Sequence, residues 1–383
     1  MPVIYLNNAA TSWPKPQRVK DVLAESLELP VFGSGRTTGT QGIDYISLAR
    51  EKAAGLFHAD AKQIVFTHSA TDSLNIIISG FLKKNRGCHA VATALDHNSV
   101  LRPLHEFQRD GILRFDIADF AGGYVSPDTI SSLIRKDTKF AVMTHASNVL
   151  GSVQDVRAVA DILADKDIFF IVDGAQTAGH IAVDVEKIGC DAFVFTGHKA
   201  LLGVAGTGGF YLKDAEQIAP TRFGGTGTQS SELFQPEDMP EKFECGTQNI
   251  TGLAALAEGI SYVKSRGVSD IHAQGMRQTK YLVSRFREAE NIRIHHETPE
   301  VPVLSFNIEG LSCEDVGFIL SRKYGIITRT GLHCAPLVHE KIDGGAGSVR
   351  ISLSCFTTDA ECTAAADAVL EIAQNAAKRF NSA

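Results

Sequence analysis

The sequence predicts an α/β fold in which a large domain with a mostly parallel sheet is joined to a smaller C-terminal α+β domain. Over most of the first 270 residues, short apolar strands alternate with helical patterns, as expected of a parallel sheet with helices on both faces. After about residue 265 strands and helices interleave within a short stretch, as in a compact α+β unit. At 383 residues and 41.2 kDa, the chain is long enough for both units.

In the first unit each apolar strand is followed by a helical pattern. Strands are predicted at residues 64–66, 90–92, 140–143, 168–172 and 191–195. Helices are predicted from Asp72, near Val100 and from Val156. In the second unit we expect helices at 270–288 and 314–324, strands at 301–307 and 348–352, and a last helix from Asp359. The expected limits are 20–265 for the large domain, and 1–19 with 266–383 for the small one.

Composition excludes several classes of protein. The net charge of -7 provides no basic face for nucleic acid. No apolar run approaches the roughly 18 residues of a membrane span, and residues 1–10 lack the pattern of a signal peptide. The seven cysteines are scattered without a C-x-x-C pair, so neither a disulfide framework nor a metal site is expected, and a cytoplasmic location fits best.

The chemistry begins with Asp173 and Lys199, which follow the strands at 168–172 and 191–195. Carboxyl ends of parallel strands share one crevice, so both side chains can face the same ligand. Pyridoxal phosphate needs this pair: an amine that forms a Schiff base with its aldehyde, and a carboxylate that keeps its ring nitrogen protonated. A single lysine after an apolar strand is usually a solvated surface residue. The neighbouring Gln176 and His198 favour the cofactor site.

A phosphate site is expected where the strand at 64–66 leads into the next helix. Ser69, Ala70 and Thr71 lie there, at a helix N-terminus with unpaired N–H donors. The alternative is ordinary N-capping by Ser69 or Thr71.

Three residues between the strands could contact the cofactor ring. His97 lies between a strand and a helix, where an imidazole could stack on the ring and shuttle protons. Asn148 and Gln176 could donate to a phenolic oxygen. Each of the three is otherwise a loop or turn residue.

Two residues of the second unit complete the candidate site. We expect Cys334 to lie on a mobile, exposed loop beside Arg329 and His333. These neighbours favour the reactive thiolate form of the cysteine. The alternative is a buried, inert thiol. Arg350 lies on the strand at 348–352 and is suited to a bidentate grip on an α-carboxylate, although a strand arginine is more often a surface or ion-pair residue.

With these residues in view, the chain resembles the class V aminotransferase family of fold-type I pyridoxal-phosphate enzymes, and within it the cysteine desulfurase and selenocysteine lyase branch. The resemblance runs from Tyr5 to the final helix. It rests on the runs at 69–71, 96–97, 147–151, 172–176, 196–199, 243–247 and 329–334. The sequence Arg-Thr-Gly-Leu-His-Cys before residue 335 resembles the group II (SUF-like) enzymes.

The resemblance implies a seven-stranded sheet and a role for each site residue. Lys199 would carry pyridoxal phosphate and Asp173 would pair with its ring nitrogen. The other expected contacts are His97 stacked on the ring, Asn148 and Gln176 at the phenolic oxygen, and Ser69, Ala70, Thr71, Thr196 and His198 around the phosphate. Thr247 would reach the phosphate of a second subunit, which implies a homodimer with shared sites.

The resemblance also implies a reaction. Arg350, with Arg329 and Asn148, would bind the substrate, and Cys334 would take sulfur from L-cysteine as a persulfide, leaving L-alanine. A sulfur-acceptor protein is a candidate partner. The alternatives are a selenocysteine lyase, another class V lyase or transaminase, and a binding protein without turnover. The chain departs from the family pattern at Asp96, Leu332 and Asn7, where relatives often have glutamate, histidine and an acidic residue, so substrate and acceptor stay open.

Overall fold

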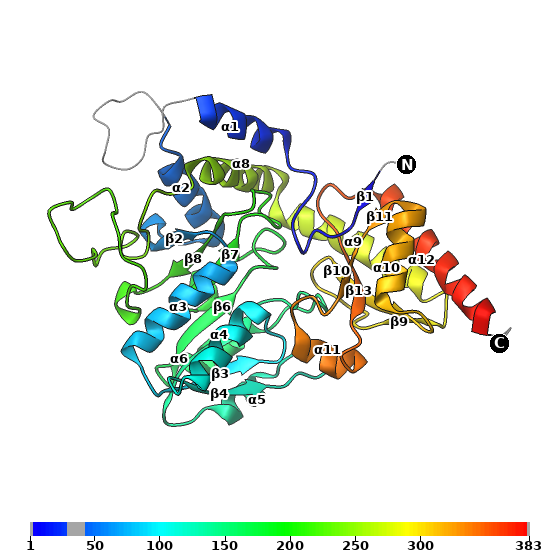
Figure 1. Cartoon of the computed structure of the whole chain (residues 1–383), viewed down its shortest axis with the longest axis horizontal. Helices are drawn as coiled ribbons and strands as arrows, with labels where there is room; N and C mark the ends of the chain where they lie inside the picture. Colours follow the sequence, from blue (N-terminus) through cyan, green and yellow to red (C-terminus); the bar gives the residue numbers. More distant parts are fainter. Residues whose placement is uncertain (1–2, 29–42, 381–383) are drawn as a thin grey trace.

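The structure, a computed structural model, describes residues 3–28 and 43–380. Its largest layer is a seven-stranded sheet of order β2-β8-β7-β6-β5-β3-β4 (Figure 1). All neighbouring strands run parallel except β8, which is antiparallel to both β2 and β7. The predicted mostly parallel sheet is therefore confirmed. Its strands are β2 (Ile64–Thr67), β3 (His89–Thr93), β4 (Arg114–Ala118), β5 (Thr138–Thr144), β6 (Phe169–Asp173), β7 (Ala192–Thr196) and β8 (Gly208–Leu212).

Helices cover both faces of this sheet because successive strand side chains point to opposite sides. Val65 packs with α3 (Ala70–Lys84) and α4 (Asn98–Arg109) in one core, whereas the adjacent Phe66 belongs to the core on the opposite face. The helices on that opposite face are α2 (Tyr45–Phe57), α5 (Pro127–Leu133), α6 (Val156–Ala164), α7 (Val185–Ile188) and α8 (Ile250–Arg266). Helix α1 (Gln17–Glu28) packs on α8 through Val19 and Val22. Short 3₁₀ turns lie at Ala61–Gln63 and Ala215–Gln217.

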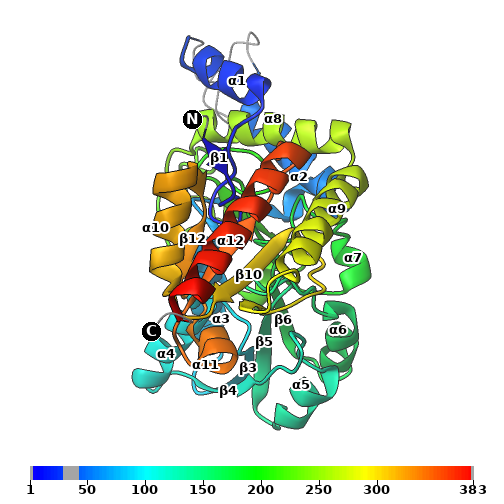
Figure 2. The ribbon, with the colours of Figure 1, turned by 90° about the vertical axis from the view of Figure 1, so that its right-hand side faces the viewer.

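A second, antiparallel sheet has the order β12-β13-β10-β9. Its strands are β9 (Ile292–Ile294), β10 (Val303–Ile308), β12 (Arg329–Gly331) and β13 (Ser348–Ser352), and Figure 2 shows it beneath α9 (Val268–Phe286), α10 (Cys313–Tyr324) and α12 (Asp359–Phe380). These elements share one apolar core, which includes Leu282, Leu304 and Val369. Helix α11 (Pro336–Asp343) differs, because its Val338 packs into a core of the large sheet.

The N-terminal segment lies against this second sheet's helices. Strand β1 (Ile4–Tyr5) pairs in parallel with β11 (Ile326–Ile327), and Leu6 is buried in the same core as α10 and α12. The domain limits, 20–265 for the large domain and 1–19 with 266–383 for the small one, remain a prediction. Among the helices of the described residues, none has a stretch long and apolar enough to span a membrane.

Candidate active site

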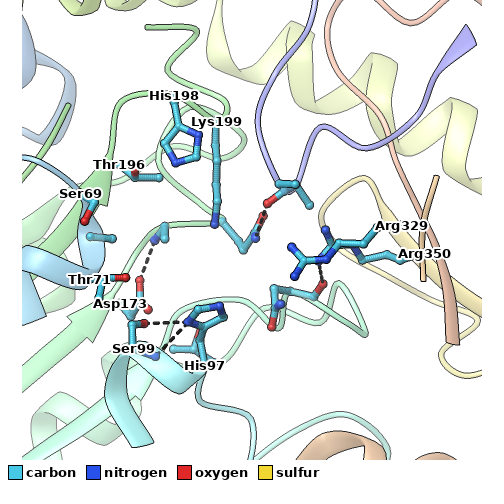
Figure 3. Close-up of a pocket in the computed structure, with 17 residues that line it drawn as sticks. Ser69, Thr71, His97, Ser99, Asp173, Thr196, His198, Lys199, Arg329 and Arg350 are labelled. Carbon is cyan, nitrogen blue, oxygen red and sulfur yellow. Dashed lines mark hydrogen bonds between the residues drawn. The ribbon is translucent and has the colours of Figure 1, made fainter. Parts of the chain in front are cut away.

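A cavity of about 190 Å³ lies at the carboxyl ends of β5, β6 and β7 and reaches to the second sheet (Figure 3). Thr144, Asp173 and Thr196 are the last residues of those three strands. Ligands of open parallel sheets bind at this edge. The predicted residues that line the cavity are Ser69, Ala70, Thr71, His97, Asn148, Asp173, Gln176, Thr196, His198, Lys199, Arg329 and Arg350. The predicted residues Cys334 and Thr247 do not.

Five further residues line the cavity that the sequence did not single out. Ser99 and Ala175 lie within two residues of predicted site residues, which was a usable signal. Thr144 ends a strand, as Asp173 does. Ala9 and Ala10 come from the N-terminal segment, just after Tyr5, where the family resemblance begins.

Lys199 and Asp173 both line this cavity. Removal from bulk water lowers the pKa of Lys199 to about 8, although the Asp173 carboxylate opposes the shift. Burial likewise raises the pKa of Asp173, against the effects of the Ala175 N–H, which donates to Oδ1 at 2.9 Å, and of Lys199. An amine with a lowered pKa that lines the same cavity as a buried carboxylate is equipped both to attack a carbonyl and to move a proton.

His97 is held as a neutral ring. The main-chain N–H of Ser99 donates to its Nδ1 at 3.0 Å, which leaves the ring proton on Nε2. Burial, and then repulsion by Lys199, lowers the pKa of His97 to about 4. The preceding Asp96 is buried, and its two oxygens accept the N–H groups of Thr93 and Thr144, each at 2.7 Å. This carboxylate joins the ends of β3 and β5 and so fixes where His97 enters the site.

The N-terminus of α3 and the loop after β7 form the end of the cavity that suits an anion. Ser69 is the N-cap of α3: its Oγ accepts the Asp72 N–H at 3.1 Å. Within the described chain, Thr196 Oγ1 and His198 Nδ1 are buried without a hydrogen-bond partner. Burial lowers the pKa of His198 to about 4, so this ring is neutral. Buried polar atoms are nearly always hydrogen-bonded in proteins, and unpaired ones at a cavity wall fit a ligand such as phosphate.

Two arginines form the opposite end. Arg350 and Arg329 are directly paired across β13 and β12, so two like charges face each other. Arg350 is buried, and its Nη1 donates to the main-chain oxygen of Asn148 at 2.8 Å, whereas Nε and Nη2 find no partner among the described residues. Burial, and then Arg329, lowers the pKa of Arg350 to about 9. A carboxylate would satisfy the free nitrogens and relieve the repulsion.

The two amides expected near a phenolic oxygen also contact the main chain. Gln176 Nε2 donates to the carbonyl of Ala9 at 3.2 Å, and Asn148 Nδ2 donates to the carbonyl of His333 at 2.7 Å. Each amide nitrogen carries a second hydrogen, so a ligand contact is compatible with these bonds.

The expectation of a mobile, exposed loop around Cys334 is only partly right. Cys334 is half-buried in a tight turn, and Arg329 Nη2 donates to its Sγ at 3.4 Å. The expectation that His333 favours the thiolate is wrong. The His333 ring is buried and bonded to Ser348 Oγ at 3.1 Å, and burial with the nearby Arg350 lowers its pKa to about 2, so it carries no charge.

Cys334 lies just outside the main cavity. It lines a neighbouring hollow of about 410 Å³ between α3 and α4, and this hollow shares Thr71, His97 and Ser99 with the cavity. Thr247 lies farther off, in a small pocket with Arg222. Its expected contact is with a second subunit, and that contact stays a prediction.

The mostly parallel seven-stranded sheet, with a lysine–aspartate cavity at its carboxyl edge, defines a protein of pyridoxal-phosphate fold type I. Residues 4–364 match the family Aminotransferase class-V. The chain therefore belongs to the class V aminotransferase family.

Relatives and solved structures agree with this assignment. A probable cysteine desulfurase of Methanothermobacter thermautotrophicus is 34% identical over 97% of this chain and 94% of the relative. A probable cysteine desulfurase of Halalkalibacterium halodurans is 30% identical over 95% of this chain and 92% of the relative. The solved structure of a cysteine desulfurase from Thermococcus onnurineus NA1 has a TM-score of 0.88 and 29% identity, and covers 97% of this chain and 95% of that one.

Proposed function

We propose that this chain is a pyridoxal-phosphate-dependent cysteine desulfurase, which converts L-cysteine to L-alanine and takes up the sulfur on Cys334 as a persulfide. One observation carries the proposal: Sγ of Cys334 lies 3.4 Å from Arg329, whose guanidinium shares the cavity with Lys199 and Arg350. A thiol is thus held just outside the end of the lysine–aspartate cavity where we propose that a carboxylate binds. The names of the two relatives support the same reading.

The residues present fit the cofactor. Thr196 Oγ1 and His198 Nδ1 are buried and unpartnered within the described chain, as a phosphate site requires. Lys199 would hold the aldehyde carbon covalently, and Asp173 would hold the ring nitrogen. The remaining contacts would come from His97 over the ring, Asn148 and Gln176 at the phenolic oxygen, and Ser69, Ala70 and Thr71 at the phosphate. When bound, pyridoxal phosphate supplies an electron sink for charge that develops on the substrate.

The substrate's orientation follows from Arg350. Its unpartnered Nε and Nη2 would grip the α-carboxylate. Arg329 would complete that end of the site, and Asn148 would hold the Arg350 guanidinium through its main-chain oxygen. This places the α-carbon toward Lys199, which takes the α-proton on Nζ. With a pKa of about 8, an appreciable fraction of the amine is neutral near pH 7 to 8 and can accept that proton.

Cys334 carries out the sulfur transfer. Its thiolate attacks the substrate sulfur, so an S–S bond forms while the substrate Cβ–Sγ bond breaks. The electron pair of the broken bond stays on the carbon side, and protonation there gives alanine. The products are alanine and a Cys334 persulfide, with no external oxidant or reductant required.

The partners follow from the same proposal. We infer a homodimer in which Thr247 reaches the partner's phosphate, and a sulfur-acceptor protein whose thiol approaches the persulfide through the hollow between α3 and α4. All seven cysteines are free thiols, which suits a reducing cytoplasm.

The test is alanine release by the purified protein from L-cysteine and, separately, from L-selenocysteine, with a thiol reductant present. We expect alanine from cysteine, and its loss by at least about a hundredfold in Cys334→Ala, because the nucleophile is removed. Selenocysteine, with its weaker C–Se bond, should still react. Alanine from selenocysteine alone in the unaltered protein would assign a selenocysteine lyase instead, and alanine from neither would reject both.

A further inference from the structure

The turn that carries Cys334 has an unusual backbone. The N–H of Ala335 donates to the carbonyl of Leu332 at 2.8 Å, which closes a four-residue turn. Its two central residues, His333 and Cys334, have φ angles of 50° and 59°. Positive φ at both central positions is the signature of a type I′ turn, which normally takes glycine, asparagine or aspartate there. A histidine and a cysteine in these conformations need outside support.

That support comes from two groups attached to the large sheet. The main-chain N–H of Asn98 donates to the carbonyl of Cys334 at 2.8 Å. The side-chain Nδ2 of Asn148 donates to the carbonyl of His333 at 2.7 Å. The carbonyl oxygens of both positive-φ residues, His333 and Cys334, are therefore held by donors from the large-sheet side of the cavity.

The same two groups belong to the site described above. Asn98 is the first residue of α4, directly after His97. The main-chain oxygen of Asn148 accepts the bond from Nη1 of Arg350. The thiol-bearing turn, the ring-stacking histidine and the carboxylate-binding arginine are therefore linked by a short chain of contacts.

We propose that the N–H of Asn98 and the amide of Asn148 are positioning groups that hold Cys334 at the distance and angle from which its sulfur attacks the substrate. This inference rests on the proposed function. Without these two bonds the strained turn would relax and the thiol would sample positions away from Arg329 and the cavity. A thiol that is already held in position reacts faster than one that must first reach it. The two bonds should therefore increase the rate of sulfur transfer and have little effect on steps that do not use the thiol.

Helix geometry offers a substitution that removes only one of these donors. Proline is well tolerated at the first position of a helix, where the N–H is not used within the helix. His97, which would precede the proline, has φ −72° and ψ 157°, an extended conformation that suits this position. Asn98→Pro therefore removes the N–H that donates to the carbonyl of Cys334, and the proline ring occupies the space of that hydrogen bond and pushes the Cys334 carbonyl away. Asn98→Ala is the matched control, because it shortens the side chain and keeps the N–H.

Two measurements on the purified proteins test the inference. The first compares alanine release from L-cysteine with release from L-selenocysteine. We expect Asn98→Pro to lower kcat for cysteine by about two- to tenfold, the effect of one lost hydrogen bond, with selenocysteine turnover and the cofactor absorption unchanged. Asn98→Ala should match the unaltered protein in both. A general structural defect would lower both reactions together.

The second measurement is the rate at which iodoacetamide labels Cys334, followed by mass spectrometry of the peptide that contains it. We expect faster labelling in Asn98→Pro, by about two- to tenfold, because the released turn exposes a half-buried thiol. Asn148→Ala, which removes the other donor, should also label faster. This readout does not depend on turnover, so it tests the positioning groups even if the protein proves not to be a desulfurase.

The outcomes separate cleanly. Equal labelling rates in Asn98→Pro, Asn148→Ala and the Asn98→Ala control would overturn the inference. So would an equal loss of cysteine and selenocysteine turnover in Asn98→Pro. If the proline variant does not fold, the labelling rate of Asn148→Ala against the unaltered protein decides the question.

Discussion

At the scale of single residues, the amine of Lys199 owes its reactivity to burial. Removal from water lowers its pKa to about 8, and the positive charges of Arg350 and Arg329 act in the same direction. The carboxylate of Asp173 works against them but does not cancel the effect of burial. A lysine in bulk water would be almost entirely protonated at pH 7, so the position of this side chain decides whether it can act as nucleophile or base.

The lowered pKa of Lys199 predicts how the rate of the proposed attachment of pyridoxal phosphate depends on pH. Only the neutral amine attacks an aldehyde, so the rate at which cofactor-free protein forms the covalent link should rise about tenfold per pH unit up to pH 8 and then level off. Visible absorbance after mixing with pyridoxal phosphate at pH 6 to 10 measures this rate. Lys199→Ala, treated with borohydride after mixing, should retain no cofactor at this site. A midpoint near the ordinary lysine value would contradict the proposed environment.

The sequence was sufficient for residues whose position follows from a strand end. Asp173 and Lys199 follow buried strands, and the geometry of a parallel sheet brings them together. The bond from Asn148 to the carbonyl of His333 had no comparable signal, because it joins main chain and side chain 185 residues apart. The burial of His333 and its hydrogen bond to Ser348 Oγ likewise come from tertiary structure, which no local pattern encodes.

At the scale of elements, β8 is one of the strands that the sequence did not predict, and its glycines show why. It begins with Gly208 and Gly209, and a pair of glycines usually indicates a turn. Here a Cβ on Gly208 would lie 2.8 Å or less from the main chain of Ser69, and one on Gly209 would lie 2.5 Å from the carbonyl of Val65. The glycines allow the strand to pass close to the N-terminus of α3. Strands such as β13 and helices such as α12 were predicted at their observed starts because apolar periodicity alone defines them.

In the proposed phosphate site, we expect the N-terminus of α3 to have a structural role and the end of β7 a binding role. Ser69→Ala removes the N-cap and should lower the free energy of unfolding by about 1 kcal/mol, whereas Ser69→Gly should lower it by only a few tenths of a kcal/mol.

Thr196→Val removes a buried hydroxyl that has no partner within the described chain. It should therefore not destabilise the cofactor-free protein, and it should weaken cofactor binding about tenfold. Denaturant unfolding and cofactor titration measure the two effects. If Thr196→Val lowers the free energy of unfolding but leaves the affinity for the cofactor unchanged, the Thr196 hydroxyl stabilises the fold and does not bind the cofactor.

At the scale of the whole molecule, the N-terminal segment connects the two sheets across the site. Asn8 Nδ2 donates to the carbonyl of Ser352 at the end of β13, at 3.0 Å. A few residues later, the N–H of Ser12 and the ammonium of Lys15 donate to the carbonyl of His198, at 2.9 and 3.0 Å. The segment thereby links the strand of Arg350 to the loop that carries Lys199, at the two ends of the cavity.

The surface of the same molecule carries an apolar segment that its own fold leaves uncovered. The connection between β8 and α8, the green loop that projects to the left in Figure 1, includes Leu233 and Phe234, with 97% and 87% of their surface exposed. Phe223, earlier in the connection, is 67% exposed. Thr247, whose proposed contact is with a second subunit, lies at the end of this connection. Exposed large apolar side chains grouped on one segment are typical of a surface that binds another protein.

We therefore expect the proposed homodimer to depend on this connection. Burying a leucine or phenylalanine contributes about 1.5 to 3 kcal/mol, so replacing Leu233 and Phe234 together by serine removes that contribution from both copies of the contact. The double variant should sediment at 41.2 kDa at micromolar concentration, where the unaltered chain sediments at twice that mass. Phe318→Ser is the control: Phe318 is also an exposed phenylalanine, 63% exposed, but it lies on α10 and outside this connection, so the variant should remain a dimer. If the double variant still sediments as a dimer, the subunit contact lies elsewhere, and if the unaltered chain is a monomer, Thr247 has no partner phosphate to reach.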